Sequence, residues 1–388
     1  MVPVLAFSSH FALKRNWRAF FRWEWLVGLA IVALMISPMA IGLYRQFDLH
    51  PEKVVNQRTG VSGLYFYFWE QSFGRLTGEN VWKDDSDVFF FVHTFVWSFL
   101  PWSFLCLMGL YQDLARLVSG YFKMAPYEEG LSLGGFVLPF VALSVSQYKL
   151  PHYIYVFFPL GAIIAAKFLY RIVYGGHYRG WYRLSWGLQG LTVVVLWGLA
   201  VWLVSVAFPM RAPILWIVAV LLMAGSIYAL TPQIQPLYRI LLPGWAAIVG
   251  VNILLNAHIY PALFQYQSGG VAARYARYEL GIPPERLFAF SADYFIYQHS
   301  LDFYSARPIG GYIRKKEDVL KLSQNGKLWL YTDAKGFRQI RSWGHQEKVL
   351  RPFDRFHISK LTPRFLDPAT RPELVQKVYL VEFVWQDQ

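Results

Sequence analysis

Two long uncharged runs, separated by a single lysine, constrain the fold of this chain more than any other feature. The runs cover residues 130–148 and 150–166, with Lys149 between them and Pro151 two positions later. Each run is close to the roughly 20 residues that a helix needs to cross about 30 Å of hydrocarbon. Because Pro151 removes a backbone donor and disfavours helix at Leu150, the pattern predicts two membrane helices that turn at one membrane face. Lys149 would then lie at the water boundary.

The composition agrees with a membrane protein that carries a soluble portion. Hydrophobic residues make up 55% of the chain and charged residues only 16%, whereas soluble domains carry about 25% charged residues. The formal charge of +13 is scattered among aromatic and acidic residues, which argues against a nucleic-acid partner. Cys106 is the only cysteine, so an intrachain disulfide is excluded.

Hydrophobic patterning predicts a bundle of about seven membrane helices over residues 23–258, with a polar outer loop at 45–87. Pro38 is compatible with the first span, because neighbouring helices can satisfy the carbonyl that it frees. The expected spans are residues 25–44, 88–112, 130–148, 150–166, 184–210, 212–238 and 240–258.

The basic residues of the short loops predict the orientation of this bundle. If the cluster at 14–22 is cytoplasmic, the loops at 113–129, 167–183 and 231–239 are cytoplasmic too, and all four carry Lys or Arg. The positive-inside rule then places Lys149, the outer loop and the C-terminal part outside. We therefore expect a multi-pass protein of the cytoplasmic (inner) membrane with an extracytoplasmic C-terminal domain.

Residues 1–13 form an apolar segment that is too short to span a membrane. It is followed by Lys14, Arg15, Arg18 and Arg22, so the charges come after the apolar part. Three interpretations are open: an interfacial helix, a signal peptide, or the end of a membrane helix whose beginning is missing. We treat residues 1–22 as a truncated helix with a basic cytoplasmic segment.

The pattern changes near residue 259, where helical segments begin to alternate with short β-rich runs. Such alternation predicts a small soluble α/β domain over 259–388, with some parallel strand pairing. The expected strands are residues 286–291, 327–332 and 377–385, and the expected helices are 270–281, 315–323 and 334–343.

The outer loop contains an aromatic and then polar stretch at residues 65–79. Arg75 in this stretch can bind a phosphate in a bidentate manner, and Lys149 can act as a point charge on the same membrane face. The alternative is that these aromatic and basic side chains only anchor the chain at the membrane interface.

Other candidate sites are weaker. The acidic residues Asp84, Asp85 and Asp87 could bind a cation, although a solvated loop edge explains them as well. We expect ordinary surface roles for Asp293, His299 and Asp302 in the soluble domain. The sequence contains no Walker loop, dinucleotide fingerprint, zinc-ligand spacing or nucleophile elbow.

The segment from Lys149 to Pro159 reads Lys-Leu-Pro-His-Tyr-Ile-Tyr-Val-Phe-Phe-Pro. It resembles the K-L-P-x-Y-x-x-x-x-x-P signature of bacterial GT-C membrane glycosyltransferases, the dolichyl-phosphate-mannose-protein mannosyltransferase-like or aminoarabinose transferase-like family. Residues 69–79 are similar to the aromatic loop of that family. Many members have Glu-His before the loop arginine, whereas Gln71 stands in place of the histidine here, which puts a possible divalent metal in doubt.

The resemblance implies a partial GT-C helical bundle that uses a polyprenyl-phosphate-linked sugar at the outer face. Lys149 and Arg75 would hold the donor phosphate, while Tyr153, Gln71 and Glu70 would line the pocket. The acceptor would be a lipid or a glycan.

The family's catalytic aspartate lies in its first outer loop, and no segment of this chain matches that region. The resemblance therefore predicts the C-terminal two-thirds of an inverting glycosyltransferase, a hexosyl or pentosyl transferase, with no catalytic base in this chain. The alternative function is a non-catalytic lipid-binding or transport protein with an outer sensor domain. The near absence of intramembrane charges and of internal symmetry argues against a transporter.

Overall fold

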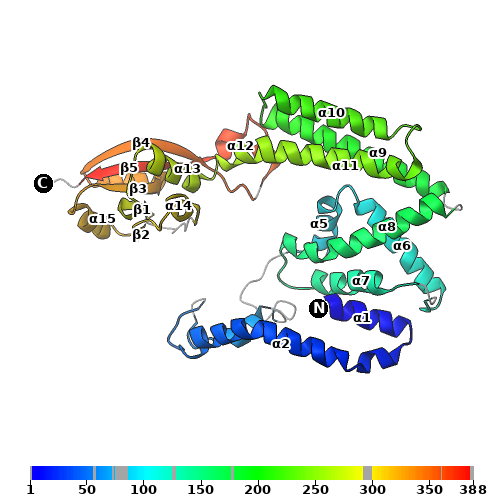
Figure 1. Cartoon of the computed structure of the whole chain (residues 1–388). Coiled ribbons are helices and arrows are strands. Elements are labelled where there is room, and N and C mark those ends of the chain that lie inside the picture. The colour runs from blue at the N-terminus through cyan, green and yellow to red at the C-terminus, as the bar shows by residue number, and fades with distance from the viewer. Residues whose placement is uncertain are drawn as a thin grey trace. The chain divides into compact units, whose positions relative to one another are not determined.

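The computed structural model describes residues 2–55, 58–71, 74, 86–124, 128–175, 179–291, 299–359 and 361–384. The chain forms two compact units (Figure 1). Each unit has its own apolar core. The first unit comprises Met1–Val194 and Gly225–Ile248, and the second comprises Val195–Ala224 and Val249–Gln388. This division into units does not test the predicted domain boundaries at residues 22 and 258, which stay predictions.

Apart from one isolated β-bridge between Val55 and Arg58, the regular secondary structure of the first unit's described residues is helical. Three further helices contribute residues to both units: α9 (Arg179–Trp202), α10 (Pro213–Ala229) and α11 (Pro236–Leu254). The helices of the first unit are α1 (Val2–Leu13), α2 (Glu24–Leu43), α3 (Gly63–Tyr65), α5 (Phe90–Ser98), α6 (Ser103–Ser119), α7 (Leu131–Ser144) and α8 (Phe158–Tyr174).

Four helical stretches of the described chain are long and apolar enough to cross a membrane: Glu24–Asp48, Pro151–Tyr174, Arg179–Ala207 and Pro236–Phe264. α7 and α10 are shorter apolar helices. Six of the seven predicted spans therefore coincide with apolar helices.

The segment predicted as one span over residues 88–112 is not a single continuous helix. That segment contains α5 and the first part of α6, which are separated near Pro101. Proline has no backbone N–H and cannot continue the helical hydrogen-bond pattern. α6 then continues to Ser119, beyond the predicted end of the span, so Asp113 and Arg116 lie on a helix and not in a loop.

The core of the first unit is dominated by phenylalanine. Phe95 of α5 and Phe136 of α7 pack edge to face, with ring centroids 5.2 Å apart, and Phe157 is completely buried beside them. Such aromatic pairs contribute about 0.5–1.5 kcal/mol beyond the area that they bury. The Phe-rich pattern thereby fixes α5, α7 and the start of α8 against one another.

α1 packs tightly on α7 because of two adjacent glycines. A Cβ atom on Gly134 would lie 1.9 Å from Ser9 Oγ, and one on Gly135 would lie 2.8 Å from the Cβ atom of Ala6. Small residues allow such close approach of helices in membranes. α1 is therefore a member of the helical unit, while its interpretation as the end of a longer membrane helix stays a prediction.

The second unit contains a five-stranded mixed sheet in the order β2-β1-β3-β5-β4. β1 pairs in parallel with β2 and β3, whereas β5 is antiparallel to β3 and β4, so the predicted parallel pairing is confirmed. The strands are β1 (Leu287–Phe290), β2 (Gly311–Ile313), β3 (Leu328–Asp333), β4 (Gln346–Arg355) and β5 (Gln376–Val384).

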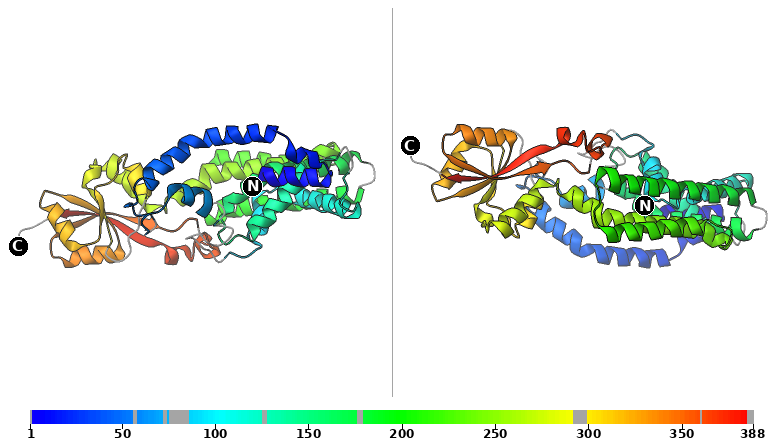
Figure 2. Two further views of the ribbon diagram at one scale, coloured as in Figure 1. Left: turned by 90° about the horizontal axis from the view of Figure 1, so that it is seen from below. Right: turned by 90° about the horizontal axis from the view of Figure 1, so that it is seen from above.

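Helices cover both faces of this sheet (Figure 2). Side chains alternate along a strand, so Leu287 of β1 packs with α13 (Ser268–Arg274), and Phe288 packs with α15 (Lys316–Ser323) and α16 (Ala334–Ser342). The predicted helices and the three predicted strands of this domain are confirmed. The sequence reading missed β2, which has three residues, and β4, which lies at the sheet edge.

Candidate functional site

The Lys149 segment forms a tight turn between α7 and α8, as predicted. α7 ends at Ser144, Leu150 is extended, and Pro151 begins a 3₁₀ helix over Pro151–Phe157 that leads into α8. The Ser146 hydroxyl donates to the carbonyl of Tyr148 at 3.3 Å. This bond and the start of the 3₁₀ helix at Pro151 place Lys149 in the turn between α7 and α8.

Lys149 is buried, with only 6% of its surface exposed. Its Nζ donates a 2.9 Å hydrogen bond to the carbonyl of Ser86. A buried ammonium group requires polar partners, because its removal from water is costly. Ser86 is the first described residue after 75–85, so Lys149 binds the returning end of the outer loop.

Tyr153 lies one turn after Lys149, against the aromatic core. Its ring centroid is 6.5 Å from that of Phe91 and 4.9 Å from that of His152. Its backbone N–H donates to the carbonyl of Leu150 at 3.0 Å. Tyr153 therefore connects the Lys149 turn to α5, while its role as a pocket wall stays a prediction.

The outer loop contains a short helical segment, Gly63–Glu70, that is attached to the end of α2. The carboxylate of Asp48 accepts hydrogen bonds from Ser62 Oγ at 2.5 Å and from the Gly63 N–H at 2.9 Å. A Cβ atom on Gly63 would lie 2.9 Å from the carbonyl oxygen of Leu43. Only glycine permits this close contact. Gly63 therefore fixes the start of the helical segment that leads to Gln71.

Glu70 closes the same loop through an ion pair. It is 9% exposed, and its Oε2 accepts a 2.8 Å bond from Nη2 of Arg58. This pairing gives Glu70 a structural partner within the loop. Gln71 follows it directly, whereas Arg75 lies outside the described residues.

The structure thus places Lys149, Tyr153, Glu70 and Gln71 in one unit. Sequence reasoning missed two of their partners, the Ser86 carbonyl and the Arg58 guanidinium. A backbone carbonyl leaves no mark in a sequence, and the spacing between Arg58 and Glu70 matches no helical or strand period.

The acidic candidates have structural partners where they are described. Asp87 accepts a 2.8 Å bond from the N–H of Phe89, and Asp302 accepts bonds from the Ile309 N–H and the Tyr312 hydroxyl. Asp84, Asp85 and Asp293 lie outside the described residues. Within the described part of the chain, no three His, Cys, Asp or Glu side chains gather as metal ligands.

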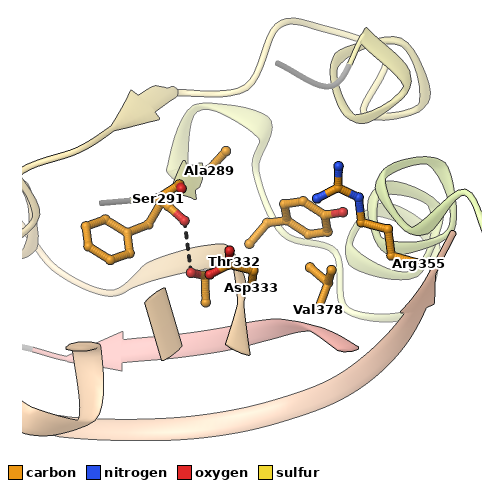
Figure 3. A pocket seen from close by; sticks show the side chains of 8 residues that line it. Ala289, Ser291, Thr332, Asp333, Arg355 and Val378 are labelled. Carbon is orange, nitrogen blue, oxygen red and sulfur yellow. Dashed lines mark hydrogen bonds between the residues drawn. The ribbon is translucent and has the colours of Figure 1, made fainter. Parts of the chain in front are cut away.

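A small cavity of the second unit lies where β1 and β3 end (Figure 3). Ser291, Asp333 and Arg355 are among its lining residues, and the Thr332 hydroxyl donates to the Phe290 carbonyl at 2.9 Å. Burial raises the pKa of Tyr331 in its wall to about 12. Ligands often bind at the carboxyl ends of parallel strands, but a volume of about 20 Å³ holds little more than one water molecule.

Comparison with solved structures identifies a known fold that this chain shares. No protein-family model and no curated protein matches this sequence. The crystal structure of ArnT from Cupriavidus metallidurans bound to undecaprenyl phosphate superposes with a TM-score of 0.63 over 98% of this chain, at 15% sequence identity. The chain has the fold of ArnT. The apo structure of the same ArnT gives a TM-score of 0.60 and 16% identity.

The similarity to ArnT confirms the predicted GT-C-type bundle followed by a small α/β domain. Together with the apolar helices, this fold supports a multi-pass membrane protein. This chain spans 64% of the length of the ArnT structures. The side of the membrane on which the C-terminal domain lies stays a prediction.

Proposed function

We propose that this chain is the donor-phosphate-binding part of a membrane glycosyltransferase. The enzyme would move a sugar from a polyprenyl-phosphate donor to a lipid or glycan acceptor at the outer face of the cytoplasmic membrane. The observation that carries the proposal is the buried Lys149, which lies in the turn between two apolar helices of an ArnT-like fold.

The chemistry of Lys149 fits a lipid phosphate. An ammonium group has three donors, and the hydrogen bond to Ser86 directs one of them toward the end of the outer loop. The turn lies between two apolar helices, so a ligand with a long hydrocarbon tail and an anionic head would match both environments. The ArnT structure with undecaprenyl phosphate offers a precedent for such a ligand in this fold.

In the proposed reaction, an acceptor hydroxyl attacks the anomeric carbon of the sugar and displaces the lipid phosphate. The hydroxyl loses its proton to a carboxylate base, and the lipid phosphate leaves with the bonding electron pair. Lys149 and Arg75 would stabilise the negative charge that develops on this phosphate. The base is expected in a region that this chain does not match, so the proposal assigns substrate binding, not the whole reaction, to these residues.

Donor binding tests the proposal directly, because it does not require the complete catalytic site. Undecaprenyl phosphate would be titrated into the purified chain in detergent, and bound lipid would be counted by native mass spectrometry. Each of Lys149→Ala and Arg75→Ala should weaken binding by about tenfold or more, since a charge-assisted hydrogen bond contributes about 1.5–3 kcal/mol.

Arg211→Ala is the matched control, because Arg211 is an exposed basic residue far along the chain from the site. It should bind the lipid as the unmodified chain does. Unchanged binding in both Lys149→Ala and Arg75→Ala, with the helical fold retained by circular dichroism, would overturn the phosphate assignment.

A further inference from the structure

A second charged region lies at the other end of the α7–α8 pair. Glu129 precedes α7 and Lys149 follows it, whereas Lys167 and Arg171 lie in the last turns of α8. α7 has 14 residues and α8 has 17. At about 1.5 Å per residue, roughly 20–25 Å of helix separates this region from Lys149. The two regions therefore lie toward opposite faces of the membrane.

A large cavity opens in this region of the first unit. Its volume is about 1070 Å³, slightly above the usual range of about 300–1,000 Å³ for ligand pockets. Its walls come from α6, the segment before α7, and α8. The charged lining residues are Asp113, Arg116, Lys123, Glu128, Glu129, Lys167 and Arg171.

Three ion pairs connect the charged residues of this cluster. Arg171 Nη1 lies 2.7 Å from Asp113 Oδ1, and Lys167 Nζ lies 2.7 Å from Glu129 Oε1 and 3.5 Å from Asp113 Oδ2. Burial opposes ionisation of Glu129, but bonds from Lys167 and from the hydroxyl and N–H of Ser132 outweigh it and lower the pKa of Glu129 to about 2. Glu129 is therefore ionised at neutral pH.

The cluster also holds a donor that needs an acceptor. Nη2 of Arg171 is buried and has no hydrogen-bond partner among the described residues. Buried donors are nearly always satisfied, by protein, water or a ligand. Arg171 lines the cavity, so a turn of its guanidinium would bring this N–H to an anion bound there, and Arg116 and Lys123 add two exposed positive charges to the same walls. The four basic residues outnumber the three acidic ones.

The remaining walls are suited to lipid. Leu117, Met124, Leu133 and Ala166 contribute apolar lining. Around the cavity, Tyr170 is 67% exposed and Tyr121 is 85% exposed. Exposed aromatic residues at helix ends are typical of the membrane–water boundary. The cavity thus combines a polar, net-positive region with apolar walls at the depth of lipid head groups.

We propose that this cavity binds the phosphate of an anionic glycerophospholipid at the membrane face opposite Lys149. Arg171 would donate its buried Nη2 to a phosphate oxygen, and Arg116 and Lys123 would attract the head group. Basic pockets between membrane helices bind anionic head groups elsewhere by the same chemistry. This inference is independent of the proposed glycosyl transfer, because it involves other residues and another membrane face.

The test compares phosphatidylglycerol with phosphatidylcholine on the purified chain in detergent, by native mass spectrometry and by thermal melting. The unmodified chain should retain phosphatidylglycerol, and this lipid should raise its Tm. Phosphatidylcholine should be retained much less and should raise the Tm much less. Arg171→Gln and the double change Arg116→Gln with Lys123→Gln should each lower phosphatidylglycerol retention by about tenfold. The double variant keeps the proposal testable if Arg171→Gln fails to fold, because both of its positions are exposed.

Arg183→Gln is the matched control, since Arg183 is an exposed basic residue at the start of α9 and does not line the cavity. It should retain phosphatidylglycerol as the unmodified chain does. Equal retention of the two lipids, or full retention by the double variant, would overturn the proposal. Equal stabilisation by millimolar inorganic phosphate would also overturn it, because the site would then bind free phosphate and not a lipid.

Discussion

The two ends of the α7–α8 pair hold their cations in different ways. At one end, the ammonium of Lys149 donates to a neutral carbonyl, that of Ser86. At the other end, Lys167 and Arg171 form ion pairs with Asp113 and Glu129. Breaking a buried ion pair on one side is costly, because it leaves a buried charge without its counter-ion. We therefore expect the Asp113–Glu129 end to contribute more to stability, whereas Lys149 serves ligand binding in the function proposed above.

The largest stability effect should come from Asp113→Ala. Its side chain and that of Arg171 are only 11% and 17% exposed, so this change leaves Arg171 buried without a counter-ion. Breaking a buried ion pair on one side costs about 3–5 kcal/mol. Thermal melting in detergent should show a clearly lower Tm than for the unmodified chain.

Glu382→Gln provides the control for Asp113→Ala, because the Lys327–Glu382 pair is largely exposed on the lysine side. Exposed pairs contribute about 0–1 kcal/mol, so its Tm should barely change. An equal decrease in Tm in the two variants would show that the ion pairs of Asp113 stabilise the fold no more than an exposed pair does.

Lys149→Met should have the opposite pattern to Asp113→Ala: a smaller loss of stability and a large loss of donor-lipid affinity. Methionine replaces the charged side chain by an apolar one of similar length, and the lost hydrogen bond to the Ser86 carbonyl costs about 1–3 kcal/mol. Donor-lipid affinity should nevertheless fall by about tenfold or more. A stability loss larger than that of Asp113→Ala, measured by the same melting experiment, would contradict the comparison.

An intermediate effect is expected for Arg58→Ala in the outer loop. This change leaves the buried carboxylate of Glu70 without its 2.8 Å partner, while Arg58 itself is half exposed. We expect a loss of about 1–3 kcal/mol that is local to the loop. Limited proteolysis should detect it as faster cleavage near residues 58–71, and Arg45→Ala should not accelerate cleavage there.

The smallest effect concerns pH. The pKa of Glu129 is lowered from 4.5 to about 2, so the ionised form stabilises the folded state. This contribution is fully present above about pH 4.5 and is lost as the pH falls toward 2. Because the side chain is 38% exposed, solvent screening reduces its size. Between pH 5 and 2, the Tm of the unmodified chain should fall more steeply with decreasing pH than the Tm of Glu129→Gln. The reason is that unfolding of the unmodified chain takes up about one additional proton, at Glu129, in this range.

The exposed Glu317 supplies the control for the pH experiment. Glu317→Gln should melt with the same pH dependence as the unmodified chain, since Glu317 lies exposed in the first turn of α15. A Glu129→Gln profile that coincides with the unmodified chain over this range would show that the carboxylate is not coupled to folding.

The sequence predicted those helices and strands whose apolar residues lie together in one short stretch. Examples are the two helices on either side of Lys149 and the strands β1, β3 and β5. β4 escaped prediction because it is largely charged and contains Pro352. Its place at the sheet edge explains both features, since edge strands tolerate proline and charge.

Contacts between distant residues could not be predicted in the same way. Lys149 bonds to the carbonyl of Ser86, 63 residues earlier, and no side-chain identity records such a bond. The cavity near Arg171 likewise draws its walls from three separate segments. The turn at Lys149 was therefore predictable from the sequence, whereas its partner and the opposite charge cluster required the fold.

The most direct test of the central claim is the preference of the chain for undecaprenyl phosphate over undecaprenol, which lacks the phosphate. Competition between the two lipids would be measured by native mass spectrometry for the unmodified chain and for Lys149→Met. We predict that the unmodified chain prefers the phosphorylated lipid by about tenfold or more and that Lys149→Met abolishes this preference. An unchanged preference in a folded Lys149→Met variant would contradict the account.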